Sequence, residues 1–250
     1  MRFDGKRVIV TGGSGSLGHA VSIAFAREGA RVAVHYHSDR AAAAATLDAM
    51  TGDGHFSVCA DMTDAGQVRS MIDDAAGRLG GLDVLVNCAG IHLAQPICDT
   101  SYEEWQEQWT RTLAVNVQAM ANVTWCAIRH MADGGVIVGI SSRGAFRGEP
   151  EHPAYGASKA ALNNFAGSMA IALAPRGIRV ATVAPSVVQA DPNAPYLHDV
   201  TPEQVHWQSP TGRSATPEDV ANAVLFLASD EGAFATGAVL DLNGASYLRL

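Results

Sequence analysis

Short apolar runs alternate with longer amphipathic stretches along the whole chain. Most of the runs are apolar on both faces, which is typical of strands in a parallel sheet that is covered by helices. These predicted strands lie at 7–10, 31–36, 55–60, 82–87, 135–141, 178–184 and 238–243. The amphipathic stretches predict helices at 17–28, 39–51, 64–79, 102–131, 153–174 and 217–229. Asp64 and Thr216 fit the N-caps of two of these helices, and Pro217 fits a first helical turn.

This alternation of strands and helices predicts an α/β fold. Connected by right-handed crossovers, the elements form a Rossmann-type doubly wound parallel sheet of about seven strands with helices on both faces. No linker rich in Pro, Gly and Ser divides the chain, so residues 1–250 are expected to form a single domain. The stretch 186–212 has no clear period, and at that length it is expected to be a substrate loop or lid.

Composition argues against several kinds of partner and site. The net charge of −8 and the lack of a Lys or Arg run argue against a nucleic-acid surface. Neither a signal sequence nor an apolar stretch of about 18 residues is present, so no membrane segment is expected and the cytoplasm is the expected location. The four cysteines lack C-x-x-C spacing and the nine histidines lack metal-ligand spacing, so neither a disulfide framework nor a bound metal is expected.

The first chemical signal is the stretch VTGGSGSLG at 10–18. It fits G-x-G-x-x-G through Gly13, Gly15 and Gly18, and it also fits T-G-x-x-G-x-x-G. The pattern T-G-x-x-x-G-x-G fails because Ser16 takes the place of a glycine. The loop follows the first strand and opens the first helix, where small residues and backbone N–H groups bind a pyrophosphate. No Gly-Lys-Ser/Thr follows, which excludes a Walker A loop, whereas a tight turn without a ligand stays an alternative.

The second signal is the pair Tyr155 and Lys159. Their spacing of four residues in a helix-forming segment places both side chains on one helix face. An ammonium beside a phenol favours the phenolate and lowers a pKa that is normally about 10. The chain has only two lysines, Lys6 and Lys159, so a pair at this spacing rarely arises by chance.

Together these features resemble the short-chain dehydrogenase/reductase family over essentially the whole chain. The matching residues are Thr11, Gly12 and Gly18, Asp61, the NCAG stretch 87–90, Asn116, Ser142, Tyr155, Lys159, Pro185 and the tail 226–244. The glycine pattern is similar to that of the longer, sugar-nucleotide-modifying branch, but the chain has no room for the extra substrate domain of that branch. The other motifs resemble the single-domain branch that includes the 3-oxoacyl-carrier-protein reductases, with the glycine moved from position 16 to position 15.

The resemblance implies an NAD(P)-dependent oxidoreductase that transfers a hydride between nicotinamide and a carbonyl or alcohol group. Tyr155 is then the general acid in reduction and the general base in oxidation. Lys159 is implied to lower the pKa of this tyrosine and to bind the nicotinamide ribose. Ser142 is implied to hydrogen-bond the substrate oxygen, with Ser141 as a rival. Asn116 is implied to hold a water of the proton relay, although it also fits a helix-packing amide.

Two other functions stay open beside the oxidoreductase. A non-catalytic, dinucleotide-binding regulatory protein of the same fold is supported by departures from the family pattern at Ser16, Ser186 and Ala190. The family usually has glycine at the second of these positions and threonine at the third. Such a protein has no need of a tuned tyrosine, which argues against it. An epimerase or dehydratase of the longer branch is disfavoured by the length of the chain.

The resemblance also implies which residues contact the cofactor. They are Gly12, Ser14, Gly15, Ser16, Leu17, Gly18, Tyr36, His37, Ser38, Arg40, Asp61, Met62, Asn87, Ala89, Gly90, Tyr155, Lys159, Pro185 and Val188. NAD-preferring relatives carry an acidic residue at the end of the second strand, where this chain has Tyr36. His37, Ser38 and Arg40 can supply donors to a 2′-phosphate. NADP(H) is therefore expected over NAD(H), which stays possible.

The substrate is expected to be a small carbonyl or alcohol compound. Candidates for its contacts are His92, Arg143, Phe146, Arg147, His152, Tyr196, His198 and Trp207. The two arginines either meet an anionic substrate or pair with Glu149 or Glu151. The resemblance further implies a homotetramer that associates through the helices at 102–131 and 153–174 and through the last strand with the C-terminal tail.

Overall fold

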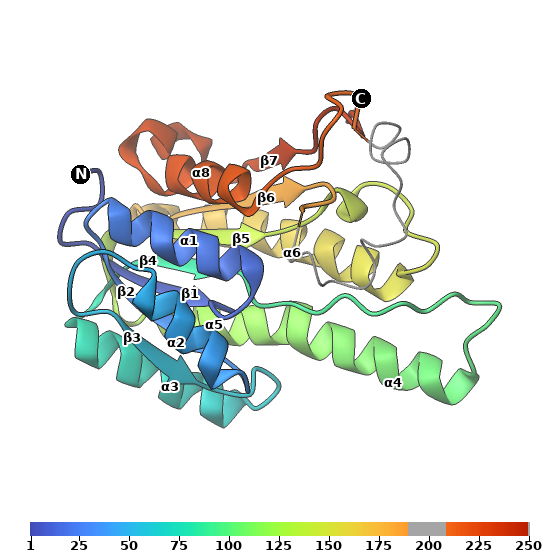
Figure 1. Ribbon diagram of the computed structural model, residues 1–250, viewed down its shortest axis with the longest axis horizontal. Coiled ribbons are helices and arrows are strands. Elements are labelled where there is room, and N and C mark those ends of the chain that lie inside the picture. Colours follow the sequence, from blue (N-terminus) through green and yellow to red (C-terminus); the bar gives the residue numbers. More distant parts are fainter. Residues whose placement is uncertain (190–208, 250) are drawn as a thin grey trace.

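Seven strands form one sheet in the part of the chain that the computed structural model describes, residues 1–189 and 209–249 (Figure 1). They are β1 (Arg7–Thr11), β2 (Arg31–Tyr36), β3 (Phe56–Cys59), β4 (Leu82–Asn87), β5 (Met131–Ile140), β6 (Arg179–Pro185) and β7 (Val239–Leu242). Their order in the sheet is β3-β2-β1-β4-β5-β6-β7, and each neighbouring pair is parallel. This confirms the doubly wound parallel sheet that the sequence predicts.

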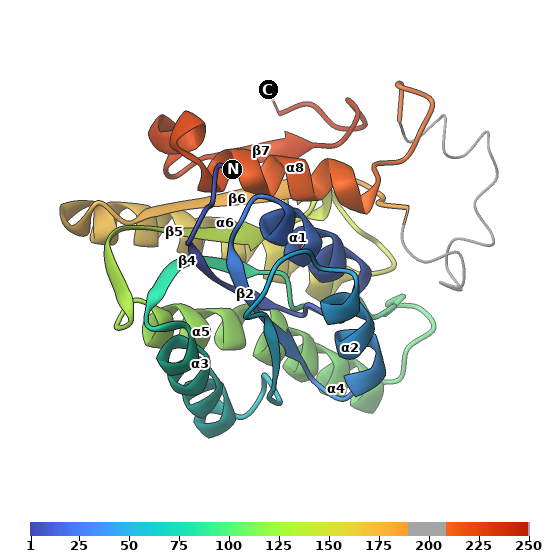
Figure 2. The same ribbon diagram turned by 60° about the vertical axis from the view of Figure 1, so that its left-hand side comes forward.

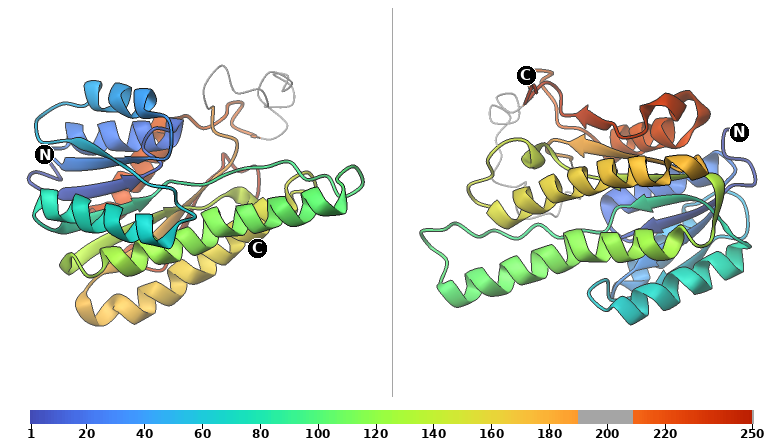
Figure 3. Two further views of the ribbon diagram at one scale, coloured as in Figure 1. Left: turned by 90° about the horizontal axis from the view of Figure 1, so that it is seen from below. Right: turned by 180° about the vertical axis from the view of Figure 1, so that it is seen from behind.

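Helices cover both faces of the sheet (Figures 1 and 2). They are α1 (Ser16–Arg27), α2 (Arg40–Asp48), α3 (Ala65–Leu79), α4 (Tyr102–Leu113), α5 (Ala119–Ala127), α6 (Pro153–Leu173) and α8 (Pro217–Ala228). α1, α2 and α8 lie on one face, and α3 to α6 lie on the other. Figure 3 shows α4 and α5 following one another along one line, with α6 beside them.

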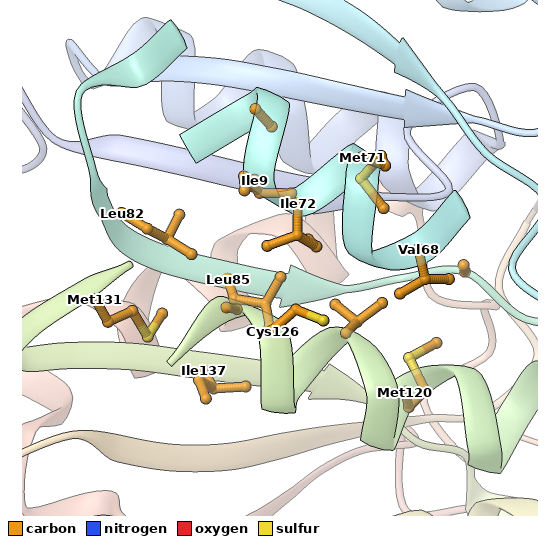
Figure 4. Close-up of a cluster of buried hydrophobic side chains, with 14 of the residues drawn as sticks. Ile9, Val68, Met71, Ile72, Leu82, Leu85, Met120, Cys126, Met131 and Ile137 are labelled. Carbon is orange, nitrogen blue, oxygen red and sulfur yellow. The ribbon is translucent and has the colours of Figure 1, made fainter. Parts of the chain in front are cut away.

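Two apolar clusters hold these layers together. Alternate residues of each strand point to opposite faces, so Ile9 of β1 joins one cluster while Val8 and Val10 join the other. Figure 4 shows the first cluster, in which Ile72 of α3 and Leu85 of β4 lie between the helices and the sheet. All five side chains are fully buried. Each such burial stabilises the fold by about 1.5–3 kcal/mol, which explains why the strands are apolar on both faces.

The prediction of a single helix at 102–131 is wrong in two respects. A π-helical turn, Ala114–Gln118, separates α4 from α5, and in it the N–H of Ala119 bonds to the carbonyl of Ala114. The chain then leaves α5 at Ala127, and β5 begins at Met131, earlier than the expected residue 135. Met131 pairs with Leu82 of β4 ahead of an irregularity in the register, which extends the strand toward its amino end. An apolar pattern alone carries neither feature.

The predicted helix starts are confirmed where their caps were identified. The side chain of Asp64 accepts hydrogen bonds from the backbone N–H groups of Gly66 and Gln67 at the start of α3. Thr216 accepts from Asp219 N–H at the start of α8, and Pro217 occupies the first turn. These side chains satisfy backbone donors that have no partner within the helix.

The sheet order reverses between β1 and β4, and this places the functional region. The chain proceeds outward from β1 through β2 to β3, then returns to pair β4 with the other side of β1. In such sheets a ligand binds in the crevice outside the carboxyl ends of the strands at the switch point. The loops that follow β1, β2, β4 and β5 meet there. Of the expected substrate loop 186–212, residues 190–208 lie outside the described residues.

Candidate active site

The glycine loop between β1 and α1 is built around close backbone contacts. Gly12 has a φ of +65°, and a Cβ there would lie 2.8 Å from the Cα of Ala89. A Cβ at Gly13 would overlap Val34 of β2, and one at Gly18 would overlap the carbonyl oxygen of Gly12. Gly15 caps α1, and a Cβ there would make only an ordinary contact of 3.4 Å. Three of the four glycines are therefore required by packing, whereas Gly15 leaves the start of the helix open.

Replacing Gly18 with alanine is expected to lower the free energy of unfolding by about 1–3 kcal/mol, because the new methyl group overpacks the loop. The matched control is Gly77→Ala in α3, where the new Cβ meets no atom within 4 Å. That change is expected to stabilise the protein by about 0.5–1 kcal/mol, because alanine loses less backbone entropy on folding. Urea denaturation measures both values, and equal effects of the two changes would contradict the packing role of Gly18.

A cleft of about 630 Å³ opens between this loop and the ends of β2, β3 and β4. The predicted cofactor residues that line it are Gly12, Ser14, Gly15, Ser16, Leu17, Gly18, His37, Asp61, Met62, Ala89 and Gly90. It is also lined by residues that are not among the predicted cofactor contacts: His35, Thr63, Cys88, Ile91, Arg111 and Val115. Two of these have a signal in the sequence: Cys88 lies within the NCAG stretch, and His35 is a polar residue within the apolar run RVAVHY.

The other predicted cofactor residues lie apart from the lining of this cleft. Asn87 is buried at the end of β4, where its Nδ2 lies 3.4 Å from the hydroxyl of Thr124. Tyr36 is half-buried, and Ser38 and Arg40 are exposed between β2 and α2. Pro185 is buried at the end of β6. These positions place them near the strand ends without making them walls of the cleft.

Charged groups gather where β2 and β3 end. The Nε2 of His37 lies 3.9 Å from a carboxylate oxygen of Asp61. Hydrogen bonds from Thr63 lower the pKa of Asp61, and the nearby His37 adds to the effect. Asp39, the first carboxylate after β2, accepts a hydrogen bond of 2.8 Å from Ala42 N–H and so caps α2.

Lys159 and Tyr155 lie on one face of α6, as their spacing predicts. The Nζ of Lys159 lies 5.5 Å from the centre of the Tyr155 ring and donates a hydrogen bond of 2.8 Å to the carbonyl of Ile140. The lysine is only 4% exposed, and burial lowers its pKa to about 8. It is therefore a cation in an apolar setting, whose charge is sensitive to its surroundings.

Two neighbouring serines at the end of β5 have different environments. Ser141 is buried, and its hydroxyl lies 3.5 Å from the backbone carbonyl of Lys159. Ser142 is half-buried and lines a cavity together with Tyr155. Its Oγ accepts a hydrogen bond of 3.0 Å from Gly144 N–H. The hydroxyl proton of Ser142 is not used in this bond and can be donated to another group. The geometry thus favours Ser142 over Ser141 for contact with a substrate.

Asn116 lies fully buried in the π-helical turn. Its Oδ1 accepts from Ile91 N–H at 2.8 Å, and its Nδ2 donates to the Ile91 carbonyl and to the hydroxyl of Ser158. The side chain therefore joins the loop after β4 to α6. Both N–H groups of the Asn116 side chain therefore already have partners within the protein. A relay water at this residue would have to bond to a carbonyl oxygen instead.

A second cavity of about 490 Å³ adjoins the cleft, because Ser16 and Leu17 line both. The predicted residues in its wall are His92, Ser142, Arg143, Arg147, His152, Tyr155 and Val188. Phe146 is not in this wall. The guanidinium carbon of Arg249 instead lies over the Phe146 ring, 4.5 Å from the ring centre. The candidates Tyr196, His198 and Trp207, and the departure at Ala190, lie outside the described residues.

A stack of aromatic rings forms one side of this cavity. The ring centres of His92 and His152 lie 3.8 Å apart with the rings nearly parallel, and the ring centres of His92 and Tyr155 lie 4.4 Å apart with the rings nearly perpendicular. Burial, the neighbouring His152 and Lys159 together lower the pKa of His92 to about 4. His92 is therefore neutral at physiological pH and adds no charge beside the phenol.

The two arginines of the cavity are held by other parts of the protein. Arg143 is buried and donates a hydrogen bond of 2.9 Å to the hydroxyl of Ser246 in the C-terminal tail. The Nε of Arg147 lies 3.7 Å from the carboxylate of Glu149. Of the two interpretations of Arg147, the structure therefore favours pairing with Glu149.

Within residues 1–189 and 209–249, no helix has both the length and the apolar character needed to cross a bilayer. In the same part of the chain, no group of three or more His, Cys, Asp or Glu side chains is arranged to hold a metal ion.

Comparison with known proteins agrees with this geometry. The family model described as enoyl-(acyl carrier protein) reductase matches residues 12–244. The chain is 36% identical to an uncharacterized oxidoreductase of Methylorubrum extorquens, over 97% of this chain and 98% of that protein. It is 33% identical to the 3-oxoacyl-[acyl-carrier-protein] reductase of Staphylococcus aureus, with the same coverage. A solved short-chain dehydrogenase of Burkholderia cenocepacia in complex with NADP is 34% identical and has a TM-score of 0.89, over 98% of this chain and 99% of that one.

Proposed function

We propose that this chain, which belongs to the short-chain dehydrogenase/reductase family of NAD(P)-dependent oxidoreductases, uses Tyr155 to exchange a proton with the oxygen of its substrate. The protein acts on carbonyl or alcohol groups, as its named relatives do. One observation carries the assignment of the site. The cleft beside the glycine loop and the cavity beside Tyr155 share a wall at Ser16 and Leu17. A cofactor in the first therefore lies next to a substrate in the second.

The cleft has the features that a nicotinamide dinucleotide requires. Gly12 and Gly18 let the loop pack tightly against the protein, and the open start of α1 at Gly15 supplies N–H donors and partial positive charge for a phosphate. Asp61 and Met62 line the far end, where the family places the adenine. When bound, the nicotinamide supplies or accepts the hydride.

The residues of the cavity would transfer the proton and bind the substrate oxygen. In reduction, the Tyr155 hydroxyl donates its proton to the carbonyl oxygen, and in oxidation the phenolate takes it back from the alcohol. The ammonium of Lys159 stabilises the phenolate that forms. Ser142 donates a hydrogen bond to the same substrate oxygen and so fixes the carbonyl beside the phenol. Asn116 keeps the loop after β4 against α6, which holds Gly90 beside Lys159.

A fluorescence titration followed by a turnover assay tests this function. NADPH or NADH is added to the protein and the change in nicotinamide fluorescence is measured. Oxidation of the bound cofactor is then followed across a broad panel of small carbonyl compounds, including acyl thioesters, sugars, steroids and ketones. We expect binding and turnover with at least one class. Binding without turnover on the whole panel would favour the regulatory protein instead.

We further propose that the protein prefers NADP(H). Tyr36 takes the place of the carboxylate that would repel a 2′-phosphate. His37 lines the cleft, and Arg40 is exposed nearby at the start of α2. We expect NADPH to bind about tenfold more tightly than NADH, a difference of about 1.4 kcal/mol that one charged hydrogen bond can supply. Arg40→Ala and His37→Ala should each reduce this ratio, whereas Arg69→Ala on α3 should not. Dissociation constants at fixed salt and pH measure it, and tighter NADH binding or an unchanged ratio in Arg40→Ala contradicts the proposal.

A homotetramer is the proposed assembly. Large apolar side chains are exposed on the helices through which the family associates: Tyr102 (71%), Trp125 (52%) and Ile171 (80%). Leu248 in the C-terminal tail is 68% exposed as well. Contact between copies would remove these surfaces from water. Light scattering at micromolar concentration should give four times the 26.1 kDa chain mass, and a monomeric mass would refute the proposal.

The chain is proposed to act as one domain, 1–250, in the cytoplasm on a small-molecule substrate, without a nucleic-acid or membrane partner. The described strands all join one sheet, and the net charge of −8 disfavours a nucleic-acid surface. The proposed substrate loop 186–212 is supported at its start, because residues 186–188 line the cavity beside Tyr155.

A further inference from the structure

His35 is a buried polar side chain at the carboxyl end of β2, beneath the glycine loop. It is only 1% exposed. Its Nδ1 accepts a hydrogen bond of 2.9 Å from Gly12 N–H, and its Nε2 lies 3.1 Å from the carbonyl oxygen of Ala60. A backbone N–H can only donate and a carbonyl can only accept, so the ring must be neutral, with its proton on Nε2. Burial lowers the pKa of His35 and keeps it in this form.

His35 holds the glycine loop through two hydrogen bonds. The backbone carbonyl of His35 accepts the N–H of Gly13 at 2.7 Å, while its ring accepts the N–H of Gly12. Two successive amides of the loop therefore end on His35. The carbonyl of Gly12 in turn accepts the N–H of Gly15, the cap of α1, at 3.0 Å. The position of Gly12 thus sets where the start of α1 faces the cleft.

The same ring reaches the opposite wall of the cleft. Ala60, which accepts the hydrogen bond from Nε2, directly precedes Asp61 and Met62. Both of these residues line the cleft, as does His35 itself. One imidazole therefore links the glycine loop to the segment that follows β3.

We propose that His35 is a positioning residue for the cofactor: its Nδ1 holds the glycine loop in the conformation that binds the dinucleotide. The proposal rests on the binding of a nicotinamide dinucleotide in this cleft. Without the acceptor, the ligand-free loop can relax and turn Gly12 N–H toward water. Cofactor binding must then return this N–H to a buried place without a partner, so the cost appears in the dissociation constant. The groups at Tyr155 are untouched, so the chemical step is unaffected.

Two variants of His35 separate its two hydrogen bonds. In His35→Asn the side-chain oxygen lies about where Nδ1 lay, so it can still accept from Gly12 N–H, but the bond to Ala60 is lost. In His35→Gln the longer amide reaches the place of Nε2 and can donate to Ala60, but Gly12 N–H loses its acceptor. Both variants replace a buried imidazole with an amide, and the shorter Asn leaves the larger void, so a merely structural role would harm His35→Asn at least as much as His35→Gln.

The dissociation constant of NADPH, measured by fluorescence, is the main readout. We expect His35→Asn to stay within about threefold of wild type and His35→Gln to lose about tenfold or more, which is about 1.4 kcal/mol. At saturating cofactor, kcat should be unchanged in both. His55→Gln is the control, because His55 also accepts a backbone N–H, from Val32, but does not line the cleft. It should leave the dissociation constant unchanged.

Three results distinguish the outcomes. Equal affinities in His35→Asn and His35→Gln, or the opposite order, overturn the role of Nδ1. Nitrogen-15 spectra of the wild-type imidazole test it without any variant, so the test survives if a variant does not fold. These spectra should show a neutral ring with the proton on Nε2, and a proton on Nδ1 would overturn the proposal. Failure of the wild type to bind either nicotinamide cofactor would instead refute the proposed function.

Discussion

Tyr155→Phe is expected to lower kcat by about 10³-fold, within the range of loss for a general acid. The substitution removes one hydroxyl and keeps the ring, so the edge contact with His92 is preserved. Lys159 and the glycine loop are unchanged, and the dissociation constant of NADPH should therefore stay within about threefold of wild type. Steady-state kinetics with the best carbonyl substrate and a fluorescence titration measure the two quantities.

Tyr102→Phe provides the matched control, because it makes the same chemical change on a tyrosine that is 71% exposed on α4. It should leave both kcat and cofactor affinity at wild-type values. If Tyr155→Phe kept a large share of wild-type activity, the general acid would have to be another group. A large loss of cofactor binding would instead show that the hydroxyl holds the ribose or the loop rather than the reacting proton.

Lys159→Met is expected to lower kcat/KM by about 10²-fold or more, because an uncharged side chain no longer stabilises the phenolate. Methionine has a similar length and suits the buried site, so the change removes the charge and the hydrogen bond to Ile140 rather than the packing. Lys159→Arg should lose activity as well, although it keeps the charge, because the larger guanidinium does not fit the place of a lysine that is only 4% exposed. Lys6→Met, at the other lysine of the chain and on the surface, is the control.

The pH profile gives an independent check on Lys159. Because burial lowers its pKa to about 8, the lysine carries its charge below that pH and loses it above. For carbonyl reduction, kcat/KM should therefore be flat at lower pH and fall as the pH rises through about 8, with an apparent value that belongs to the Tyr155–Lys159 pair. In Lys159→Met, kcat/KM should no longer fall as the pH rises through about 8. The same fall in the variant would assign it to another group.

The architecture could be predicted from the sequence because its signal is repeated. Seven apolar runs and their intervening amphipathic stretches all favour the same doubly wound sheet. The face shared by Tyr155 and Lys159 also follows from the sequence, because α6 is a regular helix and the period of 3.6 residues holds throughout. Such predictions depend only on local periodicity.

The parts that could not be predicted depend on contacts between distant segments. The π-helical turn at Asn116 is held by Ile91 and Ser158, 25 and 42 residues away, and no local pattern announces it. The role of His35 depends on its place between Gly12, which follows β1, and Ala60, which follows β3. In the sequence it is only a polar residue in an apolar strand, and such a residue has several possible explanations. Most of the wall of the substrate cavity likewise comes from loops, although Ser16 and Leu17 lie on α1 and Tyr155 on α6.

Transfer of a hydride and a proton between a nicotinamide and a carbonyl compound is the proposed reaction of this site. The most direct measurement uses NADPH with deuterium at C4 of the nicotinamide, prepared separately in each stereochemical form, in a single turnover with an excess of enzyme. Mass spectrometry of the alcohol product should find the deuterium of one form on the former carbonyl carbon, and Tyr155→Phe should form almost none of this product in the same time. Bound cofactor that transfers no deuterium to any carbonyl compound of the panel would contradict this reaction.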